Sequence, residues 1–481
     1  NRIDMIDEAP GGDILCKSVD KYYYVFDRHT CRFRVYDGPK PPVMHRYKVS
    51  AAEVGWIAGM ERYAGMEVRV LYRDRQGGYW VWSNKGMDRV VKVRKPLKPV
   101  RLGGGSGDEV VRAMMRDSHS RVWIADKNGY VHVIKSGEKP MCLGADGRLV
   151  AGGARFGHNV YCMAEDSEGN IWLGTKPGGL FRLRPEGTGF AVDRYVHRRG
   201  DAYSLSCDKV YSICFDGSGR MWVGTYGGGV NIVEKPGAGH ISFINKNNRL
   251  SGYPAEAVKV RCLHPWRGGT MLIGTGGGLY SCRLVGHGRG VSAVFTANRR
   301  DPYDAHSLSN NEVMGMAADG HGDVYVATYG GGVNKVLAGS FRGGRLRFHA
   351  YTMADGLASD VNINITADGQ GALWVVSENS LTCFDTSKGS MTNYAQGFMA
   401  EGFAFTEARP LAFGADSLAF GTTRGVFSFG REDARKSGYV PNIVFGCDST
   451  VSLKPEEKSF TITFSALDYN KAEDIWYAYR M

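Results

Sequence analysis

Three stretches of the sequence repeat one pattern and decide the fold: VYCMAEDSEGNIWLGT at residues 160–175, VYSICFDGSGRMWVGT at 210–225 and VMGMAADGHGDVYVAT at 313–328. Each copy opens with an alternating apolar segment, which predicts a half-buried β-strand. An Asp and a Gly three residues apart follow. This spacing is typical of a tight turn in which the Asp side chain bonds the backbone and the Gly takes a positive φ. A second apolar segment, built around an aromatic residue, completes a predicted β-hairpin.

Looser copies extend the repeat along most of the chain, beginning at Val68, Val111 and Val260 or ending at Ser377 and Thr423. The aromatic position of the second strand falls, in order, at Trp80, Trp123, Trp172, Trp222, Leu272, Tyr325, Trp374 and Ala419. Successive positions are 43 to 53 residues apart. A period of about 45–50 residues with four short strands per unit is typical of the blades of a β-propeller.

The composition agrees with an all-β protein and excludes several other classes. Of 481 residues, 66 are Gly, 43% are hydrophobic and 11% are aromatic. The Gly residues show no Gly-X-Y period and Pro is not enriched, and this excludes collagen and low-complexity disorder. No run approaches 18 uncharged apolar residues, so no membrane span is predicted. The ten Cys show no zinc-ribbon spacing, and Cys162 and Cys262, at equivalent strand positions, are predicted to be small buried core residues.

The formal net charge of +11 is unevenly distributed along the sequence. Residues 85–101 hold seven basic residues and one acid. A basic run can mark contact with nucleic acid or another polyanion, but no helical recognition pattern accompanies this one. We therefore expect a solvated linker there, and no nucleic-acid contact by this region.

Motifs of enzymes, metal sites and nucleotide sites are absent from the sequence. There is no Gly-x4-Gly-Lys-Ser/Thr phosphate loop and no His-Glu-x-x-His zinc helix. The segment that begins at Asp166 resembles a calcium loop, but Pro177 stands where the closing Glu belongs, so turn chemistry explains it better. Each repeat Asp is explained by its turn, and no catalytic carboxylate pair can be identified. We expect no metal, no cofactor and no catalysis by this region.

The longer loops between the units, at residues 198–210, 299–313 and 351–361, also repeat. Because neighbouring strands alternate in direction, these loops and the turns between second and third strands emerge on one face. The residues placed there are Lys176, Tyr226 and Tyr329 from the turns and Arg199, Tyr203, Arg300 and Tyr303 from the loops. Aromatic rings stack on the apolar faces of sugars, and arginines bond hydroxyl or acidic groups. These seven are therefore the candidate ligand-binding residues.

The unit Val-x-x-Ile-x-x-Asp-x-x-Gly-x-x-Trp-x-Gly-Thr, with its Asp-x-x-Ser-Leu-Ser linkers, resembles the regulator-propeller repeat. That repeat is typical of the extracytoplasmic sensor half of hybrid two-component systems in Bacteroides-type bacteria. The segment SFTITFSALDYNKAEDIWYAYRM, residues 459–481, is similar to the opening of the three-tyrosine β-sandwich domain that follows the propellers in that family. Tyr469, Tyr477 and Tyr479 stand where its aromatic pattern places them.

Three regions are expected. Residues 103–437 are predicted to form a seven-bladed β-propeller. Residues 1–102 hold blade-like units, one of them near Tyr23, and are interpreted as the end of an upstream propeller, with membership of the main ring as the alternative. Residues 438–481 are interpreted as the truncated beginning of an Ig-like β-sandwich, the three-tyrosine domain.

The resemblance implies a periplasmic ligand-sensing region of a histidine kinase, which controls polysaccharide-utilisation genes. It further implies a homodimer formed through the C-terminal sandwich and a membrane helix beyond Met481. The expected ligand is an oligosaccharide, and the paired arginines at 198–199 and 299–300 weakly favour an acidic one. Two alternatives stay open: a carbohydrate-active enzyme, either lyase or glycosidase, and a protein-interaction scaffold.

Overall fold

The chain divides into two compact units in a computed structural model: Pro96–Ser437, and Asn1–Lys95 together with Gly438–Met481. Each unit is described by itself. The structure describes residues 3–8, 14–27, 30, 32–37, 69–73, 79–83, 86–90, 99–102, 109–250, 252–285, 292–337, 345–394, 402–413, 417–430, 443–445 and 464–466.

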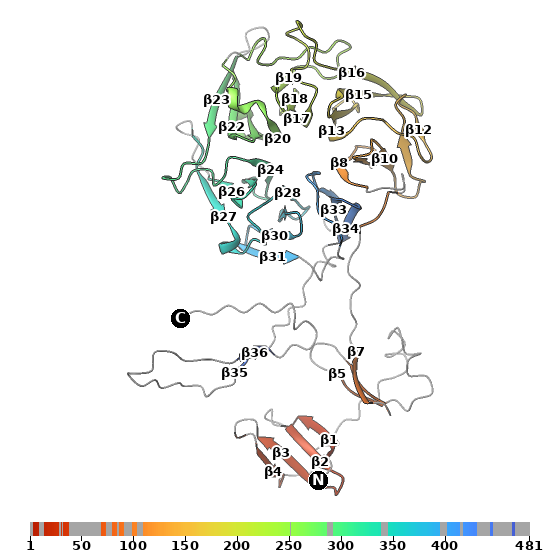
Figure 1. Ribbon diagram of the computed structural model, residues 1–481, viewed down its shortest axis with the longest axis vertical. Helices are drawn as coiled ribbons and strands as arrows, with labels where there is room; N and C mark the ends of the chain where they lie inside the picture. The colour runs from red at the N-terminus through yellow and green to blue at the C-terminus, as the bar shows by residue number, and fades with distance from the viewer. Residues whose placement is uncertain are drawn as a thin grey trace. The chain divides into compact units, whose positions relative to one another are not determined.

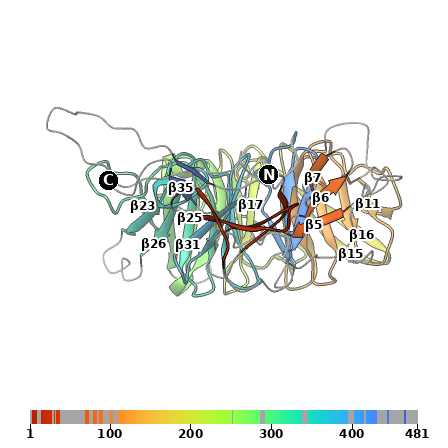
Figure 2. The same ribbon diagram turned by 90° about the horizontal axis from the view of Figure 1, so that it is seen from below.

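The described residues of the larger unit form seven antiparallel sheets, which follow one another around a ring (Figure 1). Figure 2 shows the ring from the side, with strands running across its thickness. The strands, sheet by sheet, are β8 (Val111–Arg116), β9 (Val122–Asp126), β10 (Val131–Ile134), β11 (Met141–Leu143) and β12 (Leu149–Val150); β13 (Val160–Glu165), β14 (Ile171–Thr175), β15 (Gly179–Glu186) and β16 (Gly189–Tyr195); β17 (Val210–Phe215), β18 (Met221–Thr225) and β19 (Gly229–Val233); β20 (Val260–Trp266), β21 (Thr270–Thr275), β22 (Gly278–Val285) and β23 (Ser292–Asn298); β24 (Val313–Ala318), β25 (Val324–Thr328), β26 (Val333–Val336) and β27 (Phe348–Tyr351); β28 (Asn364–Ala367), β29 (Leu373–Val376), β30 (Leu381–Asp385) and β31 (Ser390–Tyr394); and β32 (Leu411–Phe413), β33 (Ser417–Thr422) and β34 (Gly425–Gly430).

Strands within each sheet lie side by side in chain order, as expected for propeller blades. The described helices are three short 3₁₀ segments, η2 (Ala255–Val258), η3 (Arg267–Gly269) and η6 (Met353–Asp355). The prediction of an all-β propeller is confirmed. Within the described residues, no helix has the length and apolar character needed to span a membrane.

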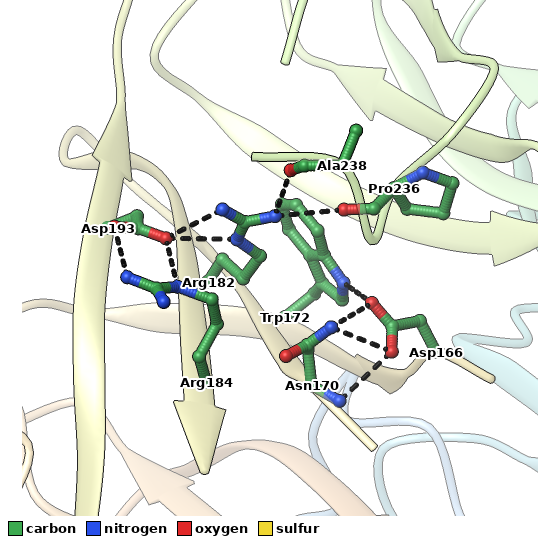
Figure 3. Close-up of polar contacts among 8 residues, drawn as sticks. All are labelled: Asp166, Asn170, Trp172, Arg182, Arg184, Asp193, Pro236 and Ala238. Carbon is green, nitrogen blue, oxygen red and sulfur yellow. Dashed lines mark hydrogen bonds and ion pairs between the residues drawn. The ribbon is translucent and has the colours of Figure 1, made fainter. Parts of the chain in front are cut away.

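Asp166 shows how the repeat motif folds (Figure 3). Its Oδ1 accepts hydrogen bonds from the backbone N–H of Glu168 (3.0 Å) and Asn170 (2.9 Å), which closes the turn between β13 and β14. Its Oδ2 accepts a hydrogen bond from Trp172 Nε1 at 2.8 Å. The predicted turn chemistry is confirmed, and the same carboxylate also orients the buried indole. Equivalent bonds join Asp117 to Trp123, Asp216 to Trp222 and Asp368 to Trp374.

Neighbouring sheets approach most closely at a Gly in the second strand. A Cβ built on Gly174 would lie 2.6 Å from Cγ1 of Val210, the first residue of the next sheet. A Cβ built on Gly421 would lie 3.0 Å from Cγ1 of Val111. Because Gly421 belongs to the last sheet and Val111 to the first, this contact is part of the closure of the ring.

A backbone pairing also closes the ring. Val100, which precedes the first sheet, donates its N–H to the carbonyl of Val426 in β34 at 2.7 Å, and Val426 donates to the carbonyl of Val100 at 3.0 Å. The N–H of Gly425 donates to the carbonyl of Glu109 at 2.8 Å. The last sheet is thus completed by chain from the N-terminal side of the unit.

Arg182 on β15 links two neighbouring sheets (Figure 3). It is 3% exposed, and its guanidinium bonds Asp193 of β16 within its own sheet. Its Nη1 donates to the carbonyls of Pro236 (3.1 Å) and Ala238 (2.7 Å), which follow β19 of the next sheet. A buried charge is stable only with such partners, so this arginine is a structural residue.

The smaller unit contains sheets of four, three and two strands among its described residues. These are β1 (Ile3–Glu8), β2 (Ile14–Ser18), β3 (Tyr23–Asp27) and β4 (Arg32–Val35); β5 (Arg69–Arg73), β6 (Tyr79–Ser83) and β7 (Gly86–Val90); and β35 (Ile443–Phe445) with β36 (Phe464–Ala466). The sandwich tyrosines Tyr469, Tyr477 and Tyr479 lie outside the described residues. The assignments of residues 1–102 and 438–481 stay predictions.

Candidate functional site

A cavity lies where the seven sheets meet, and each sheet contributes one segment to its wall. The lining segments are 112–114 of β8, 161–163 of β13, 211–213 of β17, 261–263 of β20, 314–316 of β24, Asn364 of β28 and residues 407–409 before β32. The cavity volume is about 120 Å³. Pockets that enclose a small molecule usually measure ~300 Å³ or more. A ligand of that size therefore has to lie across the mouth of the cavity.

A β-bulge in the first strand of five sheets aims one side chain at this cavity. In β13, Val160 pairs with Thr175 and Cys162 pairs with Gly174, which leaves Tyr161 without a cross-strand partner. Bulges kink a strand locally and re-aim the extra side chain. The residues at the equivalent bulges of β8, β17, β20 and β24 are Arg112, Tyr211, Arg261 and Met314. All five residues line the cavity.

Three tyrosines form a continuous series of ring contacts at the end of the cavity where the bulges lie, and this end is called the mouth. Tyr161 and Tyr211 line the cavity there, and Tyr226 lies against Tyr211. Tyr161 and Tyr211 have ring centroids 4.8 Å apart, and Tyr211 and Tyr226 have centroids 5.2 Å apart with planes inclined by 29°. Tyr161 and Tyr211 come from the bulges of adjacent sheets. Tyr226 comes from the turn after β18, so the predicted loop face and the cavity mouth coincide.

Positive charges flank the tyrosines. Lys176 Nζ donates a hydrogen bond to Tyr211 Oη at 3.1 Å, and this bond raises the pKa of the lysine. The guanidinium of Arg112 lies 5.5 Å from the ring centroid of Tyr161, and Lys259 Nζ lies 5.6 Å from that of Tyr226. Both separations are within the range of cation–π attraction. The mouth is therefore rich in hydrogen-bond donors.

Arg261 occupies the side of the mouth where carboxylates gather. Its guanidinium lies 5.8 Å from the ring centroid of Tyr226 and donates to Glu312 Oε1 at 2.6 Å. Its Nη1 lies 3.7 Å from Glu407 Oε2. The two carboxylates more than compensate the charge of Arg261, and they join β20 to the loop before β24 and to the segment before β32.

The cavity wall also contains an arginine and two cysteines. Arg409 lines the wall, and its charge reinforces the effect of burial on His264 of β20, whose pKa is lowered to about 4. His264 is therefore neutral at pH 7. Cys162 and Cys262 pack against the hydrophobic clusters of their sheets, as predicted for core residues, and as half-buried residues they also line the cavity wall. Burial raises the pKa of the Cys262 thiol to about 12, so this thiol is unreactive.

Of the seven predicted site residues, the structure brings Lys176 and Tyr226 together through their shared contact with Tyr211. Tyr329 occupies the turn equivalent to that of Tyr226 two sheets further on. It forms an isolated bridge with Val361, as Tyr226 does with Lys259, and it is 44% exposed. Among the described contacts, none links Tyr329 to the tyrosine series.

The other four predicted residues lie in the loops between sheets. Tyr203 follows the turn made by Asp201 and lies 5.9 Å from the guanidinium of Arg249. Tyr303 is 99% exposed. Arg199 and Arg300 are exposed, and the backbone N–H of Arg300 donates to Asn311 Oδ1 at 2.7 Å. In the described part of the chain, no contact joins these four to Lys176, Tyr226 or Tyr329, and their part in a ligand site stays a prediction.

The sequence did not single out the bulge residues or the ion pairs. Their only signal is the residue after the first Val of each repeat, which is Arg, Tyr, Tyr and Arg in four of the copies. In a regular strand, that residue would pair with a residue of the adjacent strand. Only the bulge directs its side chain to the central cavity. The missed residues are Arg112, Tyr161, Tyr211, Lys259, Arg261, Glu312 and Glu407.

The fold and the mouth define a β-propeller with a tyrosine- and cation-rich central opening. Residues 155–176 and 204–227 match the family model of the two component regulator propeller, and the resemblance is confirmed for these two segments. No curated protein sequence matches the chain.

Solved structures similar to this chain include two from B. thetaiotaomicron, described as extracellular domains of the hybrid two component systems BT4673 and BT3049. The first has 15% identity and a TM-score of 0.33, with 90% of this chain and 64% of that chain covered. The second has 16% identity and a TM-score of 0.27, with 96% and 73% covered. YCF48 from Cyanidioschyzon merolae has 11% identity and a TM-score of 0.46, with 69% and 98% covered.

Proposed function

We propose that this chain is the ligand-sensing region of a two-component system, located outside the cytoplasm, and that it binds glycan fragments across the cavity mouth. The match of two repeats to the two component regulator propeller supports the class. The observation that carries the ligand site is the convergence of bulge residues and turn residues around one opening. Arg112, Tyr161 and Tyr211 line the cavity, and Tyr226 and Lys176 contact Tyr211 beside it.

The chemistry of the mouth suits a polar ligand with many hydroxyl groups. Lysine, arginine and tyrosine side chains donate hydrogen bonds to sugar oxygens, and charged donors form the stronger bonds. The cavity of about 120 Å³ leaves room for part of a sugar residue, while the rest extends over the face. The predicted residues Arg199, Tyr203, Arg300, Tyr303 and Tyr329 remain candidates for contacts with that extension.

Binding at this opening would couple several sheets, because a ligand that contacts the β8, β13, β17 and β20 sheets favours one arrangement of them. A ligand shifts a conformational equilibrium by its difference in affinity between the states. In the proposed sensor, this shift passes through the C-terminal sandwich and a homodimer to a membrane helix and a histidine kinase. The kinase then regulates polysaccharide-utilisation genes from the other side of the membrane.

The test is isothermal titration of the chain against neutral, uronate-containing and sulfated oligosaccharides, with thermal unfolding in parallel. We expect one class to bind with a Kd in the micromolar range and to raise the Tm, because a ligand that binds only the folded state stabilises it. Product analysis of the same mixtures shows whether the sugar is turned over. Binding without turnover supports a sensor, whereas cleavage of the sugar would point to a carbohydrate-active enzyme. If no oligosaccharide binds, the proposal is contradicted.

A further inference from the structure

We infer that the cavity mouth contains an anion-binding subsite, formed by Arg112, Lys176 and Lys259 with Arg409 in the cavity wall, which takes the carboxylate or sulfate group of an acidic sugar. The anion site follows from the geometry of the mouth. Its assignment to a sugar rests on the proposed function.

The charge balance around the mouth is asymmetric. Arg261 is paired with both Glu312 (2.6 Å) and Glu407 (3.7 Å), so its charge is compensated and one carboxylate charge is left over on this side of the mouth. In contrast, no ion pair with a carboxylate occurs for Arg112, Lys176, Lys259 or Arg409 within the described part of the chain. These four cations and Arg261 outnumber Glu312 and Glu407, so five positive and two negative charges leave a net charge of +3 among these residues. Like charges gathered in this way repel one another, and a bound anion relieves the repulsion.

The tyrosine rings are already occupied by other contacts, which argues for an anion over a neutral sugar face. Tyr211 contacts the rings of both Tyr161 and Tyr226. Tyr161 has Arg112 and Lys176 within cation–π distance, and Tyr226 has Lys259 and Arg261. The groups left to meet a ligand are hydroxyl, ammonium and guanidinium donors. Carboxylate and sulfate oxygens are the acceptors that suit such a donor set best.

Arg409 places a further positive charge below the mouth. It lines the cavity, and its charge lowers the pKa of His264, which indicates that the guanidinium lies close to the wall of β20. His264 is neutral and supplies no competing positive charge. A cleft with cations along low-dielectric walls concentrates its field toward the opening. An anionic group at the mouth therefore experiences Arg112, Lys176, Lys259 and Arg409 together.

The experiment is isothermal titration of the full chain with trigalacturonate, with galactose 6-sulfate, with inorganic sulfate and with neutral galactotriose. The variants are Lys176→Met and Lys259→Met, which keep the length of the side chain but remove its charge. The matched control is Lys235→Met, because Lys235 is exposed and, among the described contacts, none joins it to the tyrosines that Lys176 and Lys259 contact. We expect each mouth variant to weaken binding of the anionic probes about tenfold, as for loss of one charge-assisted contact, and the control to leave it unchanged. Lys176→Arg should retain most of the binding.

Two further measurements keep the inference falsifiable. Anion binding should weaken when sodium chloride rises from about 50 to 300 mM, because partly exposed charges are screened. Bound trigalacturonate should slow acetylation of Lys176 and Lys259, but not of Lys235, in peptide mass spectrometry. Equal binding by wild type and both mouth variants would overturn the subsite. Binding of galactotriose alone would also overturn it and leave glycan sensing intact. Binding of galactose 6-sulfate and inorganic sulfate without any preference for the sugar would support the subsite and contradict glycan sensing.

Discussion

At the residue scale, the aspartate of four repeats bonds the turn backbone with one oxygen and an indole N–H with the other. Asp166 Oδ1 closes the turn, and Asp166 Oδ2 accepts the indole N–H of Trp172. In the sheet where Tyr325 replaces the Trp, Asp319 keeps the turn bonds to His321 and Asp323, but its buried Oδ2 has no partner. The turn bonds of this Asp are thus independent of the indole, whereas the bond of its second oxygen is made only where the indole is present.

We therefore expect Asp166→Asn to destabilise the propeller by about 1–3 kcal/mol, because an amide N–H₂ would face the Trp172 N–H and leave two buried donors unpaired. Asp319→Asn is the matched control and should change the free energy of unfolding by less than ~1 kcal/mol, since no indole meets its Oδ2. Urea unfolding followed by Trp fluorescence measures both. Equal costs for the two substitutions would show that the indole bond contributes nothing.

Asp117 gives the pH dependence of the same motif. Burial opposes its ionisation, but hydrogen bonds from Trp123 and Arg121 outweigh this effect and lower its pKa. A carboxyl group whose pKa is lower in the folded than in the unfolded state adds stability above its unfolded value of ~3.9 and loses it as the pH falls through the folded value. The difference in unfolding free energy between wild type and Asp117→Asn should therefore be largest at pH 5–7 and shrink below about pH 4. A difference that stays constant from pH 7 to pH 3 would contradict this.

At the element scale, the Gly of the second strand sets the distance between sheets. A Cβ on Gly274 would lie 2.6 Å from Cγ1 of Val313 in the next sheet, closer than real Cβ contacts. Gly276, two residues later in the turn, has nothing within 4 Å of its Cβ position. Gly274→Ala should cost about 1–3 kcal/mol through overpacking, whereas Gly276→Ala should be nearly neutral. Thermal unfolding of the two variants compares them directly, and a neutral Gly274→Ala would mean that the sheets can separate without penalty.

The strands and turns were largely predictable because they depend on local patterns. The hairpins predicted at residues 160–175 and 210–225 form β13 with β14 and β17 with β18, and Asp166 forms its expected turn. The site was less predictable, because its residues meet only through the ring. Lys176 and Tyr226 were found from their turn positions. Tyr161 and Arg261 depend on bulges, which the sequence pattern does not mark, and the ion pairs of Arg261 join sheets far apart in the chain.

At the scale of the whole molecule, the ring depends on pairing between its two ends. Val100 exchanges two backbone hydrogen bonds with Val426, while its side chain is 62% exposed, so the contribution of this residue comes from its backbone. Val100→Pro removes the N–H that donates to Val426 and should lower the unfolding free energy by about 2–3 kcal/mol. Val100→Ala keeps that N–H and should cost less than ~0.5 kcal/mol, as for other exposed positions. Hydrogen exchange should locate the loss in β34, since an open ring exposes the edge of its last sheet. If proline leaves both the unfolding free energy and the protection of β34 unchanged, the ring is closed by side-chain packing such as the cluster of Val111, Ala419 and Val426, and the strand pairing contributes little.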